Sequence, residues 1–338
     1  MCDRKEVAGM KYGNCLIDLH LHLDGSLSPD IIRKLSRLQN ETCTLNDQEL
    51  EERLMVSEDC KSLDEYLEKF EFPGYYLQTK ETISAAVSLL LEELHEQGLI
   101  YAEIRFAPQK HKERGLTQEE VVLAAIEGMK NAPIPASLIL CLMRGDDTSS
   151  ENLETVRLAE KYLHKGVAAI DLAGAEALYK THLYKTFFDY ASSHEIPFTI
   201  HAGEADGVES ISYALLFGAK RLGHGVRAYE SEALMKSIKE QNVTLELCPT
   251  SNLNTQIFTD LKEYPLRTFL SFGIPVTINT DNMSVSHTTL QKEYDKLIDI
   301  FHLTDEEIKQ LLLNSVHASF ASPEVKALLE DKIKDRID

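Results

Sequence analysis

Runs of hydrophobic residues alternate along most of this chain with segments of mixed polarity. Eight short runs are almost continuously apolar or β-branched, which is typical of strands buried on both faces of a parallel sheet. They are residues 15–21, 99–106, 137–143, 167–174, 197–203, 221–225, 243–249 and 275–281. The pattern therefore predicts an α/β protein built on parallel strands.

Between these runs, apolar residues recur at spacings of three and four, which predicts amphipathic helices. Examples are residues 117–131, 150–166, 182–195 and 231–242. Thr117 and Glu120 form a capping-box sequence, whereas Ser231 is followed at that spacing by Leu234. Eight strands alternating with helices predict a (β/α)8 TIM barrel. The alternative, a doubly wound open sheet, usually has a Gly-rich phosphate loop after its first strand, and none follows here.

The alternation is interrupted once, between the first and second predicted strands. Residues 24–98 contain several helix-like segments, including 62–72, where Leu63, Tyr66 and Phe70 recur on one face. An insertion after a barrel strand lies at the mouth of the barrel, where it could form a lid. An amphipathic face packed on the barrel explains the same spacing. No linker is evident, so we expect the whole chain, residues 1–338, to be one barrel domain with a helical insertion.

Composition narrows the class of partner. The chain carries a formal net charge of −20, and 43% of its residues are hydrophobic. Such an acidic surface disfavours nucleic-acid polymers and anionic membranes, and a small neutral or cationic substrate suits it better. Acidity that serves only solubility is the alternative interpretation.

The cysteines and the start of the chain indicate its compartment. The chain has six cysteines without a C-x-x-C pair, which indicates reduced thiols. The first residues lack the apolar region of a signal peptide, and no apolar run is long enough to span a membrane. We therefore expect a cytoplasmic protein. The sequence leaves its oligomeric state open, and a monomer is compatible with it.

Titratable side chains gather at the ends of the predicted strands, where TIM-barrel enzymes carry their active sites. The main ones are His20, His22, Asp24, Asp171, His201, Glu204, His224 and Asp281. His20 and His22 lie two residues apart, so both point to the same side of a strand. Any one of these residues could be an ordinary buried polar group, but their common placement favours a shared site.

A metal centre explains the set. His20, His22, His201 and Asp281 would supply three nitrogens and one carboxylate oxygen, a set that suits Zn²⁺. Water bound to zinc loses a proton near neutral pH. Glu204, close to His201 along the chain, could hold a proton in a dry cleft and act as a general acid.

His224, between two glycines, could orient or deprotonate that water and stabilise developing negative charge. A structural histidine is the alternative for this residue.

Six motifs occur in order along the chain: HLHLDGSL, DLAG, HAGE, RLGHG, ELCPTSN and INTDN. Together they resemble the adenosine deaminase branch of the metal-dependent amidohydrolases over about residues 15–300. The resemblance implies a (β/α)8 barrel with one zinc ion per chain. It also implies hydrolytic deamination of adenosine, and of 2′-deoxyadenosine, to the inosine products and ammonia. The zinc ligands that it implies are His20, His22, His201 and Asp281.

The same resemblance implies roles for the residues around the metal. Glu204 would protonate purine N1 as hydroxide attacks C6, and His224 would orient the hydroxide and stabilise the oxyanion. The backbone N–H of Gly174 would meet purine N3. Asp24 would bind a ribose hydroxyl, with His22 close to the sugar.

Two residues bear on the choice of substrate. Family members that act on adenine tend to have Glu in place of Asp24, and those that act on N6-methyl-AMP tend to have Asn, so Asp favours a nucleoside. Asn282 stands where most members have an Asp that is thought to bind purine N7. An amide donates a hydrogen bond at any pH, whereas a carboxyl must first be protonated. A deaminase of adenine or of a modified 6-aminopurine nucleoside is the alternative.

Two more distant functions fit less well. A two-metal hydrolase of phosphoesters or lactones usually needs a bridging Lys or carboxylate after a middle strand, and the fourth strand ends in DLAGAE without a Lys. A nucleoside-binding protein without catalysis would have no need of the full ligand set together with Glu204.

Overall fold

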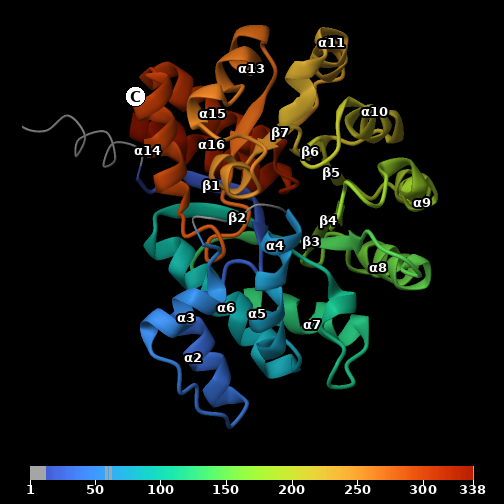
Figure 1. Cartoon of the computed structure of the whole chain (residues 1–338), viewed down its shortest axis with the longest axis vertical. Helices are drawn as coiled ribbons and strands as arrows, with labels where there is room; N and C mark the ends of the chain where they lie inside the picture. Colours follow the sequence, from blue (N-terminus) through green and yellow to red (C-terminus); the bar gives the residue numbers. More distant parts are fainter. Residues whose placement is uncertain (1–12, 58–59, 61–62, 338) are drawn as a thin grey trace, which may run out of the picture.

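The computed structural model describes residues 13–57, 60 and 63–337, and its centre is a ring of parallel strands (Figure 1). All eight predicted strands are present. They are β1 Leu16–His22, β2 Leu99–Phe106, β3 Ala136–Met143, β4 Val167–Ala173, β5 Thr199–Ala202, β6 Arg221–His224, β7 Thr244–Leu247 and β8 Val276–Ile278. Each pairs with its neighbour in parallel, in the orders β1-β2-β3-β4 and β5-β6-β7-β8.

Backbone contacts join the two four-stranded sheets into a closed barrel. On one side, the Ile170 N–H of β4 donates to the Pro197 carbonyl just before β5, at 3.1 Å. On the other, the His22 N–H donates to the Asp281 carbonyl and the Asp281 N–H donates to the His20 carbonyl, both at 2.8 Å. The predicted (β/α)8 barrel is therefore confirmed, and its seam runs between the first and last strands.

Helices surround the barrel, and the predicted amphipathic segments are among them. After β2 come η2 Pro108–Lys110, α7 Gln118–Met129, α8 Ser149–Tyr162, η3 Thr181–Tyr184, α9 Lys185–Ser193, α10 Val208–Phe217, η4 Val226–Glu230, α11 Glu232–Glu240, α12 Pro249–Asn254, η5 Leu261–Glu263, α13 Leu266–Phe272, α14 Leu290–Phe301, α15 Asp305–Ala318 and α16 Pro323–Ile337. Thr117 and Glu120 form the full capping box of α7. Ser231 caps α11 through the Leu234 N–H alone. Within the described ranges, no helix has the length and apolarity needed to cross a bilayer.

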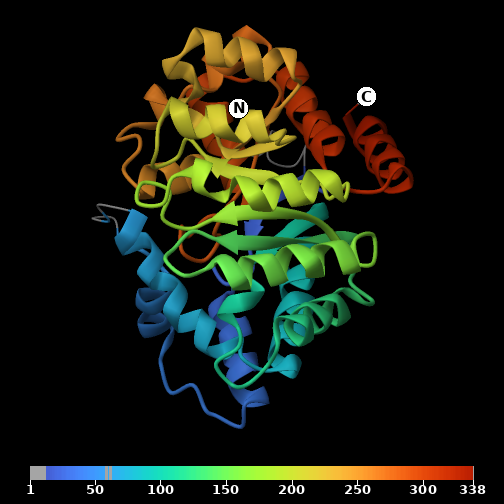
Figure 2. The same cartoon turned by 90° about the vertical axis from the view of Figure 1, so that its right-hand side faces the viewer.

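The segment between β1 and β2 is helical, as predicted. It contains α2 Pro29–Leu38, α3 Asp47–Leu54, α4 Leu63–Leu67, η1 Glu68–Phe70, α5 Glu71–Tyr76 and α6 Lys80–Glu96. The last of these, α6, packs against α7 and completes the outer ring, so the true insertion ends before it. In Figure 2 the strand arrows point toward the side of the barrel on which α4 lies.

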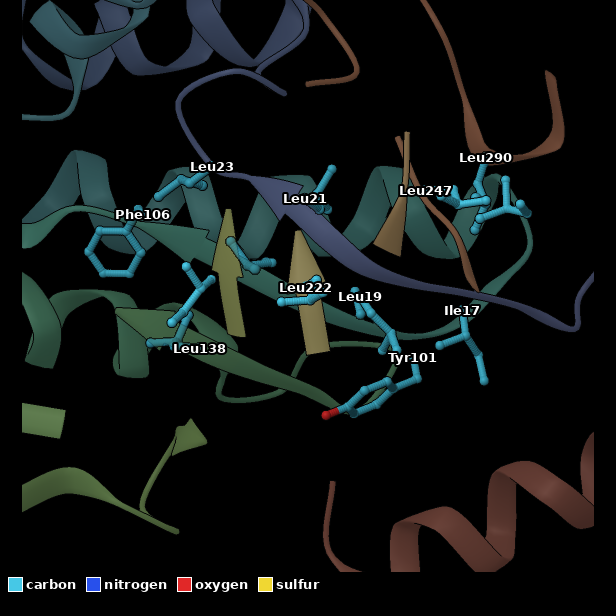
Figure 3. Packing of buried hydrophobic residues seen from close by; sticks show 14 of the residues in the cluster. Ile17, Leu19, Leu21, Leu23, Tyr101, Phe106, Leu138, Leu222, Leu247 and Leu290 are labelled. Carbon is cyan, nitrogen blue, oxygen red and sulfur yellow. The ribbon is translucent and has the colours of Figure 1, made fainter. Parts of the chain in front are cut away.

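A continuous hydrophobic core lies between the barrel and its helices. Ile17, Leu19 and Leu21 of β1 are fully buried among apolar side chains of other strands (Figure 3). The residues between them, Asp18 and His20, are equally buried but polar. Because side chains of a strand alternate between its faces, β1 presents one apolar face to the helices and one polar face to the barrel interior.

Candidate active site

A cavity of about 570 Å³ lies at the carboxyl ends of the strands. Its walls include nearly all the residues that the sequence singled out. These are His22, Asp24, Gly174, His201, Glu204, His224, Asp281 and Asn282. His20 is fully buried, and its imidazole ring centroid lies 4.5 Å from that of His201. The strand ends therefore bring together residues that are up to 262 positions apart in the sequence.

Three imidazoles and one carboxylate converge at the bottom of the cavity. The Nε2 atoms of His22 and His201 lie 3.3 Å apart. The Nε2 atoms of His20 and His22 each lie 3.4 Å from Oδ1 of Asp281. One potential ligand atom from each residue lies within 4.8 Å of all the others. Four donors this close surround a space of the size that one metal ion occupies.

Buried carboxylates fix the orientation of two of these imidazoles. Nδ1 of His20 lies 2.8 Å from Oε2 of Glu246, and Nδ1 of His201 lies 2.8 Å from Oδ2 of Asp171. A carboxylate beside Nδ1 favours the tautomer that carries its proton on Nδ1, so each ring keeps a lone pair on Nε2 for a metal. Nε2 of His20 is buried and has no hydrogen-bond partner. The donor set and this unpaired nitrogen fit a zinc ion.

A second group of donors overlaps the first. It replaces His22 and His201 with His224 and Cys248 while keeping His20 and Asp281. Burial raises the pKa of the Cys248 thiol well above its usual range. A protonated thiol is a poor ligand, so the group with three imidazoles is the better metal site.

Arg105 connects the two carboxylates that orient the imidazoles. Its guanidinium lies 2.9 Å from Asp171 and 2.9 Å from Glu246, and all three side chains are fully buried. Burial alone would raise the pKa of Glu246, but the charges of Arg105 and Arg221 hold this pKa well below its usual range. Sequence reasoning assigned no role to Arg105 or Glu246. The feature that could have identified both residues is a charged side chain within an otherwise apolar run.

Glu204 lies in the cavity wall just after β5. Its Oε2 lies 3.5 Å from Nε2 of His224, and its side chain is 6% exposed. Burial, together with the negative charge of Asp281, raises the pKa of Glu204 to about 8. The side chain is therefore a neutral carboxylic acid near pH 7 and has a proton to give.

Asn252 determines which nitrogen of His224 carries the proton. Its Oδ1 accepts from the Tyr264 hydroxyl at 3.0 Å, which turns its Nδ2 toward Nδ1 of His224, at 3.1 Å. An amide NH₂ only donates, so Nδ1 accepts and the ring proton lies on Nε2, facing Glu204. His224 also has a positive φ of 59°, which is rare for a residue with a side chain and common at functional sites.

The residues expected to contact the purine and sugar lie around the same cavity. Gly174 follows β4 with φ at 104°, a conformation that favours glycine. Burial raises the pKa of Asp24 to about 6. Asn282 packs on Gly25, where an added Cβ would lie 1.8 Å from its Oδ1, so any larger residue would displace the amide.

The insertion supplies one wall of the cavity. The Tyr66 hydroxyl of α4 lies 2.7 Å from Oγ of Ser286, in the segment after β8. The ring of Phe70 lies 6.4 Å from that of His22. Leu63, the third residue of the predicted apolar face, belongs to α4, but its side chain lies outside the described ones. The insertion thus covers the expected metal site from the solvent side.

The sequence matches the profile of one protein family. The adenosine deaminase family profile matches residues 15–336. A similar protein is the adenosine deaminase of Haemophilus ducreyi, which is 49% identical over 335 residues, or 96% of this chain and 97% of that protein.

Solved structures of deaminases and amidohydrolases share the fold. The adenine deaminase of Arthrobacter aurescens superposes with a TM-score of 0.83 at 26% identity, covering 95% of this chain and 98% of that one. An amidohydrolase of Burkholderia ambifaria, solved with bound zinc, has a TM-score of 0.87 at 19% identity, covering 100% and 94%.

Proposed function

This chain belongs to the adenosine deaminase family and deaminates adenosine, and we propose that it does so in the cavity described above with one zinc ion. The family membership confirms the resemblance seen in the sequence motifs. Its substrate is a small purine molecule. We propose that 2′-deoxyadenosine is accepted as well, and that the products are the corresponding inosines and ammonia.

The metal would be held by His20, His22, His201 and Asp281. Support comes from the convergence of their donor atoms within 4.8 Å and from the unpaired buried Nε2 of His20. A zinc ion held there would supply the positive charge that lets water lose a proton near neutral pH. The carboxylates of Asp171 and Glu246 would keep two of the imidazoles oriented for this task.

Glu204 would donate a proton to purine N1 while an oxygen nucleophile attacks C6. Its protonated state near pH 7 supports this role, because an ionised carboxylate has no proton to give. Protonation of N1 removes electron density from the ring and makes C6 more electrophilic. When the tetrahedral centre collapses, the proton of the new C6 hydroxyl passes to the amino group. The C6–N bond then breaks, ammonia leaves and the inosine carbonyl forms.

His224 would act as a hydrogen-bond donor through Nε2. Its contact with Asn252 supports this role, because Nδ1 is then occupied as an acceptor. The Nε2–H would hold the attacking oxygen in place and stabilise the negative charge that develops on it. Because Nε2 already carries the proton, this arrangement favours stabilisation over deprotonation of the water.

Substrate selection would depend on three positions around the ring and sugar. The Gly174 N–H would donate to purine N3, and Asp24 would bind a ribose hydroxyl next to His22. Asn282 would donate to purine N7. An aspartate at position 24 favours a nucleoside over free adenine, so turnover of adenosine beside adenine separates the main proposal from its alternative.

The observation that carries the metal-dependent proposal is the buried cluster of three imidazoles and Asp281. We expect purified protein to contain about one zinc per chain. Removal of the metal with a chelator should abolish the absorbance change that accompanies conversion of adenosine to inosine, and added zinc should restore it. Full activity in protein shown by metal analysis to be zinc-free would contradict the proposal.

We also propose that the protein is cytoplasmic and works as a single barrel domain. No disulfide joins the cysteines in the part of the chain that the structure describes, and one hydrophobic cluster extends from Cys15 to Ile333. Fractionation of the source cells tests the location. One cooperative unfolding transition by two independent probes would support the single domain, and separate transitions would contradict it.

A further inference from the structure

A buried carboxylate lies beneath the loop that carries Glu204. Glu176 follows Gly174 by two residues and is fully buried. Four consecutive backbone N–H groups donate to it. The donors are Gly203 at 2.7 Å to Oε1, and Glu204, Ala205 and Asp206 at 3.0, 2.8 and 3.0 Å to Oε2. The carboxylate thus fills a concave surface of backbone donors, an arrangement that stabilises negative charge.

Side chains from the neighbouring elements extend this contact. The Ser210 hydroxyl of α10 also donates to Glu176, and Ser210 lies 2.7 Å from the hydroxyl of Thr181. Arg144 donates to Thr181 at 3.0 Å and to the carbonyl of His201 at 2.7 Å. The loop after β4 is therefore connected to the loop after β5 by a continuous set of hydrogen bonds.

A carboxylate suits this position better than an amide does. It accepts at both oxygens, whereas an amide of the same shape would turn an NH₂ group toward backbone N–H groups that also donate. The loop itself is tightly built: Gly203 has φ at 76°, and a Cβ there would lie 2.4 Å from Ile211. Buried N–H groups that lose their acceptor destabilise the conformation that they hold.

We infer that Glu176 is a positioning residue for the proton donor: it fixes residues 203–206 and so holds the Glu204 carboxyl in the cavity. The inference rests on the proposed role of Glu204. Glu176 would contact no substrate atom. Its effect on catalysis would pass through the backbone of the loop and through its own negative charge.

The charge of Glu176 adds a second effect. The charged and titratable groups around Glu204 are Asp281, His201, Glu176, Arg144, His224, Tyr264 and Arg227, whose Nε donates to the Glu204 carbonyl at 2.9 Å. Among them, the negative charges of Asp281 and Glu176 oppose ionisation of Glu204, and both contribute to its raised pKa of about 8. Removing the charge of Glu176 should therefore lower the pKa of Glu204, so that it loses its proton at lower pH.

The test compares Glu176→Gln and Glu176→Asp with the wild-type enzyme. For Glu176→Gln, we expect kcat to fall by about 10²-fold, as for a small displacement of a catalytic group, with zinc content unchanged. The alkaline limb of its kcat–pH profile should also move to lower pH. Glu176→Asp keeps the charge but shortens the side chain, so kcat should fall while this limb stays in place. Glu160→Gln, which removes an exposed charge on α8, should match the wild type.

Hydrogen exchange at the amides of residues 203–206 gives a readout that does not need activity. We expect exchange at least about tenfold faster in both Glu176 variants, because Glu176→Gln replaces one acceptor oxygen with a donor and Glu176→Asp moves both oxygens away from the amides. Wild-type kcat with an unmoved alkaline limb and unchanged exchange in Glu176→Gln would overturn the inference. If Glu176→Gln does not fold, wild-type kcat and unchanged exchange in Glu176→Asp would overturn the inference. A different outcome would refute the role of Glu204 instead. In that case exchange at residues 203–206 would depend on Glu176, but the Glu204→Gln variant would retain full activity.

Discussion

Several residues predicted to form the site carry buried polar atoms without a hydrogen-bond partner. Three such atoms, each from a residue predicted to form the site, are Nε2 of His20, Oδ1 of Asp24 and Oδ1 of Asn282. A buried polar atom that lacks a partner costs about 1–3 kcal/mol of folding free energy. At the proposed site, such atoms are available to a metal or to a polar substrate.

The substitution Glu204→Gln tests the proposed proton donor. The amide keeps the shape of the side chain but cannot transfer a proton, so we expect kcat to fall by about 10²–10⁴-fold. Binding of a ground-state nucleoside analogue and zinc content should stay near the wild-type values. Steady-state kinetics, calorimetry and metal analysis measure these three quantities.

The control for that variant is Glu209→Gln, which removes an exposed carboxylate on α10 and should leave kcat unchanged. Near-normal turnover in Glu204→Gln would show that another group protonates the ring.

Asn282→Asp tests the donor expected at purine N7. The new carboxyl must be protonated to donate, whereas the native amide donates at every pH. We expect the variant to remain active at low pH and kcat/KM to fall as pH rises through the pKa of the new carboxyl. The wild type should lack this decline. Complete loss of activity at every pH would mean that this position has been misread.

At the residue level, the sequence revealed the groups expected to touch substrate or metal, together with Asp171 behind them, but missed Arg105 and Glu246. His20, His201 and Glu204 stand at the ends of apolar runs, where barrel topology predicts a site. Glu246 is 226 residues from its partner His20, and no local pattern announces that pair. Such contacts depend on which strands become neighbours, so they appear only in three dimensions.

At the level of elements, the apolar runs located every strand but overstated the length of several. The run 275–281 becomes the three-residue strand Val276–Ile278, because the chain leaves the sheet to place Asp281 with φ at 62°. The predicted helix 182–195 begins as the 3₁₀ turn η3 and continues as α9. Tight first turns of this kind are common, and hydrophobic spacing alone does not distinguish them.

Tyr66→Phe tests the attachment of the insertion to the barrel. The substitution removes the hydroxyl that contacts Ser286 but keeps the ring, so we expect a loss of about 1 kcal/mol in the free energy of unfolding. Faster amide exchange in α4 should accompany it. Tyr190→Phe removes a hydroxyl from an exposed contact with Glu160 and should change less. Equal stability and exchange in Tyr66→Phe and wild type would show that this contact does not hold the insertion.

At the scale of the whole molecule, the barrel interior holds a network of buried charges. Arg105 on β2, Asp171 on β4 and Glu246 on β7 connect three strands and support two of the proposed ligands. Buried ion pairs seldom add net stability over apolar packing, but removing one partner leaves an uncompensated charge. This network therefore makes metal binding and barrel stability depend on the same residues.

Arg105→Met tests that dependence. The variant leaves the buried Asp171 without its guanidinium and Glu246 with Arg221 alone. We expect it to lose about 3–5 kcal/mol in urea unfolding, together with reduced zinc affinity. Lys185→Met, which breaks an exposed pair with Asp189 on α9, should cost less than about 1 kcal/mol. Similar losses in the two variants would indicate that the buried network has no special role.

The junction between the first and last strands has a consequence for how activity arises. Asp281 is hydrogen-bonded through its backbone to His20 and His22, so the proposed ligands meet across the seam where the two ends of the barrel join. A chain still emerging from the ribosome, with its final third unmade, would hold the histidines but lack the aspartate that completes the set. Deaminase activity would then appear only after the first and last strands of the barrel have paired. The rate at which activity returns during refolding would therefore measure how fast the barrel closes.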